Sequence, residues 1–189
     1  MRSLQLTRSD AFIININDDR RLDLLNEIMK AKAEHPSLEN TNTGCWRSEF
    51  QYDDINWLLG NISEVLGDAI THYLKEDLSY DERLQGNDDI HFEYWTNVND
   101  PGSDNRLHSH TAFDYVAIYY IQGTDTGDIV FHNPANIMTE CSSNSPFTAR
   151  MHVAPQDGDL ILWPAWVPHE VDTNHSNKQR INIAFNIKL

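Results

Sequence analysis

Residues 105–122 read N-R-L-H-S-H-T-A-F-D-Y-V-A-I-Y-Y-I-Q, which joins two closely spaced histidines to a run of aromatic and β-branched residues. Such a run, bounded by turn-forming residues, predicts a β-strand. His108 and His110 are one residue apart, and side chains i and i+2 of an extended chain point to the same face. Two imidazoles on one face form a metal-ligand arrangement that lacks a third partner.

The apolar pattern on both sides of this stretch has a period of two from about residue 90 onward. Short segments rich in β-branched and aromatic residues alternate with the turn sequences N-D-P-G-S-D-N, G-T-D-T-G and P-Q-D-G. This pattern predicts a mainly β fold, a barrel or a sandwich of antiparallel strands, over residues 90–189.

The last predicted strand separates its side chains into two faces. Its apolar face consists of Ile181, Ile183, Phe185 and Ile187. Its other face consists of Arg180, Asn182, Ala184 and Asn186. If the apolar face packs under helices, the polar face lines the barrel interior, and an interior with arginine and asparagine indicates a ligand cavity.

The first half of the chain has a helical period. Apolar residues of segment 18–35 recur at steps of three and four: Leu22, Leu25, Ile28, Met29 and Ala33. Segment 54–77 repeats the pattern. We therefore expect a single domain, residues 1–189, in which a helical support region (1–89) packs its helices on one sheet of the β core (90–189).

Charge and cysteine content narrow the classes of partner and compartment. The chain has 14 basic and 29 acidic residues and a formal net charge of −15, which disfavours nucleic acid and anionic membranes and favours a cationic or neutral substrate. Two cysteines without metal-type spacing, and no long apolar segment, predict a cytoplasmic protein. Nothing in the sequence indicates an oligomeric state.

His169, in G-D-L-I-L-W-P-A-W-V-P-H-E-V-D, is the expected third imidazole. A tight turn leads into this strand, which ends in a proline-bounded bend immediately before the histidine. His169 lies 61 positions after His108, so only the fold can bring the two together, and barrel closure is the simplest way.

The order of these motifs resembles a known family. W-T-N, N-x-x-H-x-H, G-D-I-V-F-H-N-P, G-D-L-I-L-W-P-A-W-V-P-H-E-V and R-I-N-I-A-F-N are similar to the small 2OG-Fe(II) oxygenases related to prolyl hydroxylases, over about residues 90–189. The resemblance implies a double-stranded β-helix, a jelly-roll or cupin-like barrel. It also implies an Fe(II)- and 2-oxoglutarate-dependent dioxygenase that uses O2, releases succinate and CO2, and hydroxylates a peptidyl or prolyl residue, an amino acid or a small metabolite.

The same resemblance implies that His108, His110 and His169 are the iron ligands. Similar enzymes use His-x-Asp and a distant histidine, and here His110 occupies the aspartate position. Three neutral imidazoles leave the metal with its full charge and also suit zinc, copper or nickel. Asp114 has the same strand parity as the two nearby histidines and is the alternative ligand.

Co-substrate residues are implied as well. In similar oxygenases a basic residue about ten positions after the distal histidine binds the far carboxylate of 2-oxoglutarate, and Arg180 stands eleven positions after His169. Tyr120 occupies the place of a hydroxyl that contacts the same carboxylate. Asn97 and Asn105 complete the expected pocket.

Two other readings remain open at this level. Gly102, the His-x-His pair and Asp114 resemble the first motif of cupins, and Gly158 with Pro164 and His169 resembles the second. The chain would then be a metal-dependent enzyme or binding protein that does not use 2-oxoglutarate, or a non-catalytic metal-binding protein. Arg180 distinguishes the cupin reading from the 2-oxoglutarate-dependent one, because a cupin has no general need for a buried guanidinium opposite the metal.

Overall fold

The computed structural model describes residues 10–16, 19–38, 42–49, 65, 68, 69, 72, 91–133 and 149–188. Within these residues there are one complete α-helix and nine β-strands. They are, in chain order, β1 (Phe12–Asn15), α1 (Arg20–Glu34), β2 (Asn42–Arg47), β3 (His91–His108), β4 (Tyr115–Gln122), β5 (Ile129–His132), β6 (Arg150–Val153), β7 (Asp159–Pro164), β8 (His169–Val171) and β9 (Arg180–Lys188).

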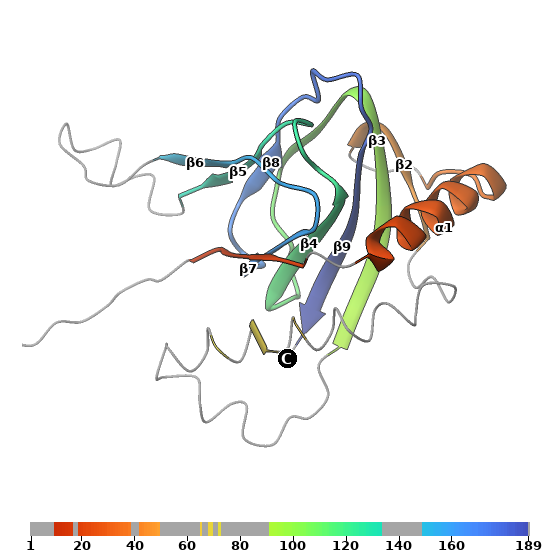
Figure 1. Cartoon of the computed structure of the whole chain (residues 1–189). Helices are drawn as coiled ribbons and strands as arrows, with labels where there is room; N and C mark the ends of the chain where they lie inside the picture. Colours follow the sequence, from red (N-terminus) through yellow and green to blue (C-terminus); the bar gives the residue numbers. More distant parts are fainter. Residues whose placement is uncertain are drawn as a thin grey trace, which may run out of the picture.

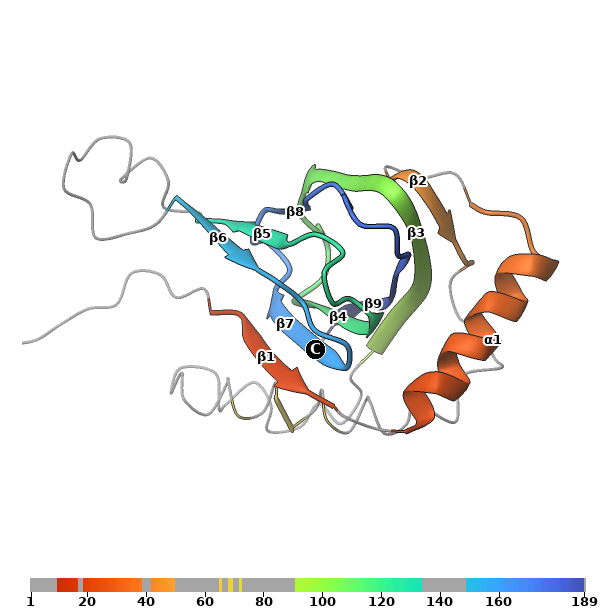
Figure 2. The same cartoon turned by 45° about the horizontal axis from the view of Figure 1, so that its top comes forward.

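The strands form one antiparallel sheet in the order β1-β7-β4-β9-β3-β8-β5-β6, with β2 paired to β3 beside this path. The sheet curls on itself into two facing walls (Figures 1 and 2). This is the mainly β, half-open barrel expected of a jelly roll.

The long strand β3 joins the two walls of the curled sheet. Its first half pairs with β9, from His91 to Asn99, and its end pairs with β8 at Asn105 and His108. Gly102 lies between these two halves with φ of +85°, a conformation that costs glycine little. The bend at this point lets one strand belong to both walls.

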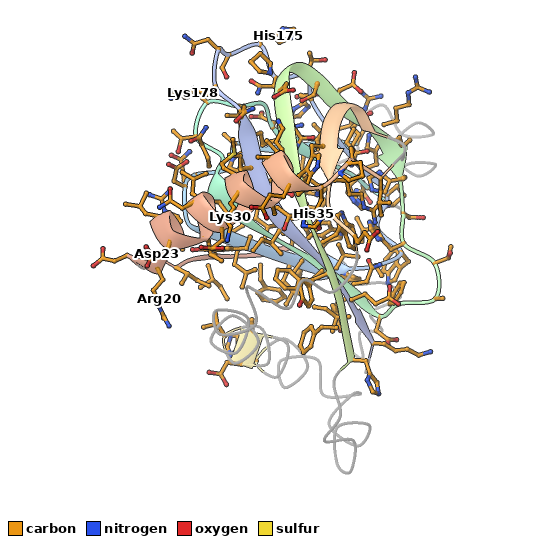
Figure 3. All side chains as sticks on the ribbon, turned by 90° about the vertical axis from the view of Figure 1, so that its right-hand side faces the viewer. Arg20, Asp23, Lys30, His35, His175 and Lys178 are labelled. Carbon is orange, nitrogen blue, oxygen red and sulfur yellow. The ribbon has the colours of Figure 1, made fainter. Side chains whose placement is uncertain are left out.

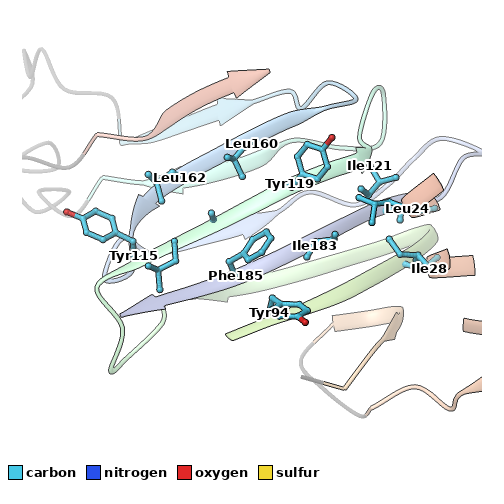
Figure 4. Close-up of a cluster of buried hydrophobic side chains, with 14 of the residues drawn as sticks. Leu24, Ile28, Tyr94, Tyr115, Tyr119, Ile121, Leu160, Leu162, Ile183 and Phe185 are labelled. Carbon is cyan, nitrogen blue, oxygen red and sulfur yellow. The ribbon is translucent and has the colours of Figure 1, made fainter. Parts of the chain in front are cut away.

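The apolar face predicted for the last strand is confirmed. Ile181, Ile183, Phe185 and Ile187 belong to the main core cluster, which lies between the outer face of the sheet and α1 (Figure 4). A second apolar cluster, which includes Ile129, Phe131 and Trp163, lies between the two walls. The sheet is therefore covered on one face and folded over on the other.

Helix α1 confirms the first predicted helix, but its buried face matches the predicted apolar stripe only in part. Its buried residues are Leu24, Ile28 and Ala31, whereas Leu22 is 57% exposed and Met29 is 37% exposed. Asp23 and Lys30 also lie on the exposed side (Figure 3). Of the predicted stripe, Ile28 is buried and Leu25 packs against the core, whereas Leu22, Met29 and Ala33 are exposed. Both sides of this helix carry apolar residues, and only contact with the sheet selects one of them.

A polar contact fixes the orientation of α1 on the sheet. The Arg21 guanidinium donates a hydrogen bond of 2.6 Å to the carbonyl oxygen of Ile121 in β4, and it forms a 3.3 Å ion pair with Asp157. None of the helical segments that the structure describes is long and apolar enough to cross a membrane.

The rest of the predicted helical support region contains β-strands as well as helical residues. Segment 54–77 lies outside the described residues except Val65, Asp68, Ala69 and His72, which are helical, and of these Ala69 is buried in the main core. Two strands were not expected there. β1 extends the sheet beyond β7, and β2 pairs with β3 between Asn97 and Asn105.

Leu24→Ala is expected to lower the free energy of unfolding by about 2–5 kcal/mol, because it leaves a cavity between α1 and the sheet. Leu22→Ala, two residues away on the exposed side, is the matched control and should change this free energy by less than about 0.5 kcal/mol. Urea denaturation followed by circular dichroism measures both. Equal losses would contradict the observed helix face.

Candidate metal and co-substrate site

A cavity of about 210 Å³ lies between the two walls of the sheet. The inward residues of β9, namely Arg180, Asn182, Ala184 and Asn186, line it, as their strand parity predicted. The other lining residues are Arg47, Trp95, Asn97, Asn99, Asn105, His108, His110, Val116, Ile118, Tyr120, His169 and Val171. Most of these lining residues are polar, and Val116, Ile118, Val171 and Ala184 are apolar.

Strand register explains how residues distant in sequence share this floor. Directly paired residues on neighbouring antiparallel strands point to the same face of a sheet. Arg47 pairs with Asn97, Asn97 pairs with Asn182, and Asn182 pairs with Tyr120. These four residues form one row across β2, β3, β9 and β4. Arg180 lies in the next row, paired with Asn99.

The three predicted histidines meet at one end of the cavity. His108 is the last residue of β3 and pairs directly with His169, the first residue of β8. Their ring centroids are 4.3 Å apart, and the ring of His110 lies 5.2 and 5.3 Å from those of His108 and His169. One ring nitrogen of each histidine lies within 4.8 Å of the others, so the group could hold a metal ion.

His110 reaches this cluster from outside the strand. β3 ends at His108, and the chain is held beyond it by a 2.9 Å hydrogen bond from the His110 backbone N–H to the carbonyl oxygen of Ala165. The ring of His110 is nearly parallel to that of His169, with an interplanar angle of 8°.

Each of the three imidazoles is oriented by an oxygen atom next to its Nδ1. The Nδ1 of His108 lies 2.7 Å from the carbonyl oxygen of Arg106, and that of His169 lies 3.0 Å from the carbonyl oxygen of Val167. The Nδ1 of His110 lies 2.7 Å from the side-chain oxygen Oδ1 of Asn186. Because a carbonyl oxygen only accepts, Nδ1 carries the proton in all three, which leaves each Nε2 lone pair for a metal.

The electrostatics of the cluster keep these rings neutral. Burial, followed by the charge of His108, lowers the pKa of His169 to about 3 and that of His110 to about 4. Burial also lowers the pKa of His108. Neutral imidazole is the form that binds metal, so no proton has to leave the cluster at neutral pH.

Arg180 lies in the row next to Tyr120 and is 1% exposed. Its Nη1 donates hydrogen bonds of 2.8 Å to the Thr126 carbonyl oxygen and 3.3 Å to the Asp172 carbonyl oxygen. Among the described residues no carboxylate forms an ion pair with it. Burial lowers the pKa of Arg180, and burial raises the pKa of Tyr120 to about 12, while the nearby guanidinium acts to lower it.

The remaining predicted site residues divide into two groups. Asn97 and Asn105 line the cavity, and Asn97 donates a 2.9 Å hydrogen bond to the side-chain oxygen of Asn182. The side-chain oxygen of Asn105 is buried without a hydrogen-bond partner among the described residues. Asp114 is exposed, does not line the cavity, and stands outside the histidine cluster.

Among the lining residues that the sequence analysis did not single out, Arg47 and Trp95 lie next to the histidine cluster. Arg47, at the end of β2, places its guanidinium 4.5 Å from the ring centroid of Trp95, and the Trp95 ring is stacked on His110 at 6.3 Å. Arg47 lies in a region that reads as helical support. In the sequence, only the short segment C-W-R at 45–47 indicates a strand, and three residues are too few to show which side chains point inward.

About half of the chain matches a protein-family model. Residues 93–186 match the model described as Putative 2OG-Fe(II) oxygenase. The match runs from β3 to β9 and contains all three histidines and Arg180. No curated protein sequence matches the chain.

Solved structures share the fold at low sequence identity. The prolyl-4-hydroxylase of Pseudomonas putida is 17% identical over 94% of this chain and 91% of its own, with a TM-score of 0.62. A prolyl hydroxylase from Trichoplax adhaerens, in complex with a hypoxia inducible factor peptide fragment, is 16% identical over 94% and 83%, with a TM-score of 0.64. HygX from Streptomyces hygroscopicus, with nickel and 2-oxoglutarate bound, is 12% identical over 95% and 83%, with a TM-score of 0.61.

The metal-free protein is expected to lose stability as the pH falls from about 6.5 toward 4. In that range the unfolded histidines, with a pKa near 6.5, take up protons, whereas folded His110 and His169 stay neutral. Protonation therefore favours the unfolded chain. The midpoint of thermal unfolding, measured in chelator from pH 7 to pH 4, should fall more steeply for the wild type than for His169→Gln. Parallel slopes would contradict the assigned pKa shifts.

Proposed function

The chain belongs to the family of Putative 2OG-Fe(II) oxygenases, and we propose that it hydroxylates a small-molecule or peptide substrate at an iron held by His108, His110 and His169. Fe(II) is the metal and 2-oxoglutarate the co-substrate of this family. The observation that carries the proposal is the shared orientation of the three imidazoles, each with Nδ1 next to an oxygen and Nε2 left for a metal.

The donor set fits Fe(II). Imidazole nitrogen suits iron as well as zinc, copper and nickel, and three protein ligands on one side leave other positions open. Because the three ligands are neutral, the metal keeps its double positive charge, which a dianionic co-substrate offsets. Asn186 supports this set indirectly, since its side-chain oxygen orients the ring of His110.

Arg180 supports a 2-oxoglutarate site in the same cavity. Its Nη1 is held by two carbonyl oxygens, and no hydrogen bond from its Nη2 or Nε to a described residue is present. A buried guanidinium with an unused edge is suited to a carboxylate, which accepts two parallel hydrogen bonds from it. The hydroxyl of Tyr120, kept protonated by its raised pKa, is a further donor for the same carboxylate.

The protein residues bind and orient the reactants. Bound Fe(II) with 2-oxoglutarate supplies the oxidising chemistry, in which O2 is consumed and succinate and CO2 are released. Val116 and Ile118 form an apolar side of the cavity, and Trp163 and Phe131 pack against His169 from behind. These residues exclude water from the histidine end of the cavity.

His110→Ala should reduce the bound iron per chain by at least tenfold under limiting iron, because one of three ligands is lost. Asp114→Asn, which removes the alternative ligand, should leave the iron content unchanged. Metal analysis of the proteins after anaerobic loading and desalting measures both. Iron loss in Asp114→Asn with retention in His110→Ala would assign the carboxylate as the third ligand.

Arg180→Gln should weaken 2-oxoglutarate binding by about 10- to 100-fold, the value of a charge-assisted pair of hydrogen bonds. The anaerobic visible absorption band of the Fe(II) chelate measures this affinity. 2-Oxopentanoate, which has the same length but no far carboxylate, is the matched ligand, and its affinity should not change in the variant. Arg180→Lys, which keeps the charge, tests for misfolding.

The same titration decides between the proposed function and its rivals. A cupin-type enzyme or a non-catalytic metal protein would bind iron without forming the 2-oxoglutarate chelate band. Absence of the band in folded, iron-loaded wild-type protein would therefore overturn the proposal.

A further inference from the structure

We propose that the turn G-T-D-T-G, residues 123–127, positions the side chains of Arg180 and Tyr120 for the far carboxylate of 2-oxoglutarate. This inference rests on the proposed function and adds positioning residues to it. The turn connects β4 to β5, and none of its five residues lines the cavity. Its residues therefore act on the co-substrate through the two side chains that do line it.

The turn fixes one edge of the Arg180 guanidinium. The carbonyl oxygen of Thr126 accepts the 2.8 Å hydrogen bond from Nη1 of Arg180. Thr126 is fully buried, and its hydroxyl donates a 2.6 Å hydrogen bond to the carbonyl oxygen of Gly123, which closes the turn. The second acceptor of Nη1, the carbonyl oxygen of Asp172, is tied to the same place, because the Asp172 backbone N–H donates 2.9 Å to the carbonyl oxygen of Asp128. Both acceptors are thus held by the backbone, which leaves the Nη2 side of the guanidinium for the co-substrate.

Gly127 lets the turn approach these groups closely. Its φ is +98°, and an added Cβ would lie 2.8 Å from the carbonyl oxygen of Asp172 and 3.3 Å from Nη1 of Arg180. The first distance is shorter than a carbon and an oxygen tolerate without a bond, so a side chain here would displace the Asp172 carbonyl, the guanidinium, or both. Glycine is needed at this position for the close approach as well as for the backbone conformation.

Gly123 has the same relation to Tyr120. An added Cβ would lie 2.8 Å from Cδ1 and 3.1 Å from Cγ of the tyrosine ring. The φ of Gly123 is not positive, so contact with the ring, and not the backbone conformation, is what restricts this position. Tyr120 is 0% exposed, and a ring packed on all sides moves only if its neighbours move. Gly123 therefore sets the place of the ring and of its hydroxyl.

Asp157 anchors the turn from outside the cavity. Its Oδ1 accepts hydrogen bonds from the backbone N–H of Gly123 at 2.9 Å, from the backbone N–H of Thr124 at 3.0 Å and from the Thr124 hydroxyl at 3.0 Å. Its Oδ2 forms the ion pair with Arg21 of α1. Binding side chains reach the precision that a ligand needs when residues behind them are held in this way.

A purely structural role for the turn makes a different prediction. A turn that only stabilises the fold would affect every ligand of the iron site alike. A turn that positions Arg180 and Tyr120 affects only ligands with a far carboxylate. 2-Oxoglutarate and 2-oxopentanoate differ in this group alone, so their affinities separate the two roles.

The test titrates both 2-oxo acids into full-length protein loaded anaerobically with Fe(II) and follows the chelate band. Gly127→Ala should weaken 2-oxoglutarate binding by about tenfold, the value of one charge-assisted hydrogen bond, and should leave 2-oxopentanoate binding and iron content unchanged. Gly44→Ala is the matched control. Gly44 also has a positive φ, +67°, but the nearest atom to its added Cβ is 3.6 Å away, on Ser103, and it does not line the cavity.

Double variants show through which side chain each glycine acts. If Gly127 acts through Arg180, Gly127→Ala should weaken 2-oxoglutarate binding by less than about twofold in the Arg180→Gln background, because effects that share one interaction are not additive. Gly123→Ala should weaken binding by about threefold in the wild type, the value of a neutral hydrogen bond, and should add nothing in the Tyr120→Phe background.

Three results would overturn the inference: unchanged 2-oxoglutarate affinity in both glycine variants, an equal loss for 2-oxopentanoate, or full additivity in both double variants. If Gly127→Ala does not fold or does not hold iron, the Gly123 pair decides, because the φ of Gly123 suits alanine. Absence of the chelate band in the wild type would instead be a failure of the proposed function, so the two failures are distinguishable.

Discussion

The pairing of His108 with His169 is the contact on which the site depends. β3 bends at Gly102 and passes from the wall that contains β9 to the wall that contains β8. Without that pairing the sheet would stay open and the third imidazole would not approach the other two. Fold closure and assembly of the histidine cluster are therefore one event, and burial of the apolar clusters on both sides of the sheet drives the closure.

Burial and hydrogen bonding act together on the three histidines. Burial lowers their pKa values, so that the neutral form prevails, and the oxygen next to each Nδ1 selects the tautomer. Two of these oxygens belong to the backbone two residues away, so they come with the local chain conformation. Only His110 relies on a side chain, Asn186, from another strand. Asn186 is therefore part of the site because it orients His110, although it does not belong to the histidine cluster itself.

The cavity of this strongly acidic protein is lined, among the described residues, by arginine, asparagine and neutral histidine, and by no aspartate or glutamate. Described carboxylates form contacts elsewhere, such as the ion pair of Arg21 with Asp157. Fields from surface charges are screened by water and salt over about 10 Å, whereas charges inside a half-enclosed cavity are screened much less. The net charge of the chain therefore says little about the electrostatics inside the cavity.

The sequence by itself determined those strands that are long enough to show an alternation of apolar and polar residues. The alternation of β9 separated its core face from its cavity face, and His-x-His with a distant histidine predicted the cluster of three imidazoles. Tertiary structure alone decided the face of α1, the reach of His110 beyond the strand end, and the entry of Arg47 and Trp95 into the cavity. The reason is physical. Parity is a local property of an extended chain, whereas the partner of a short strand such as β2, and the neighbour that covers a helix, depend on contacts between residues far apart in the sequence.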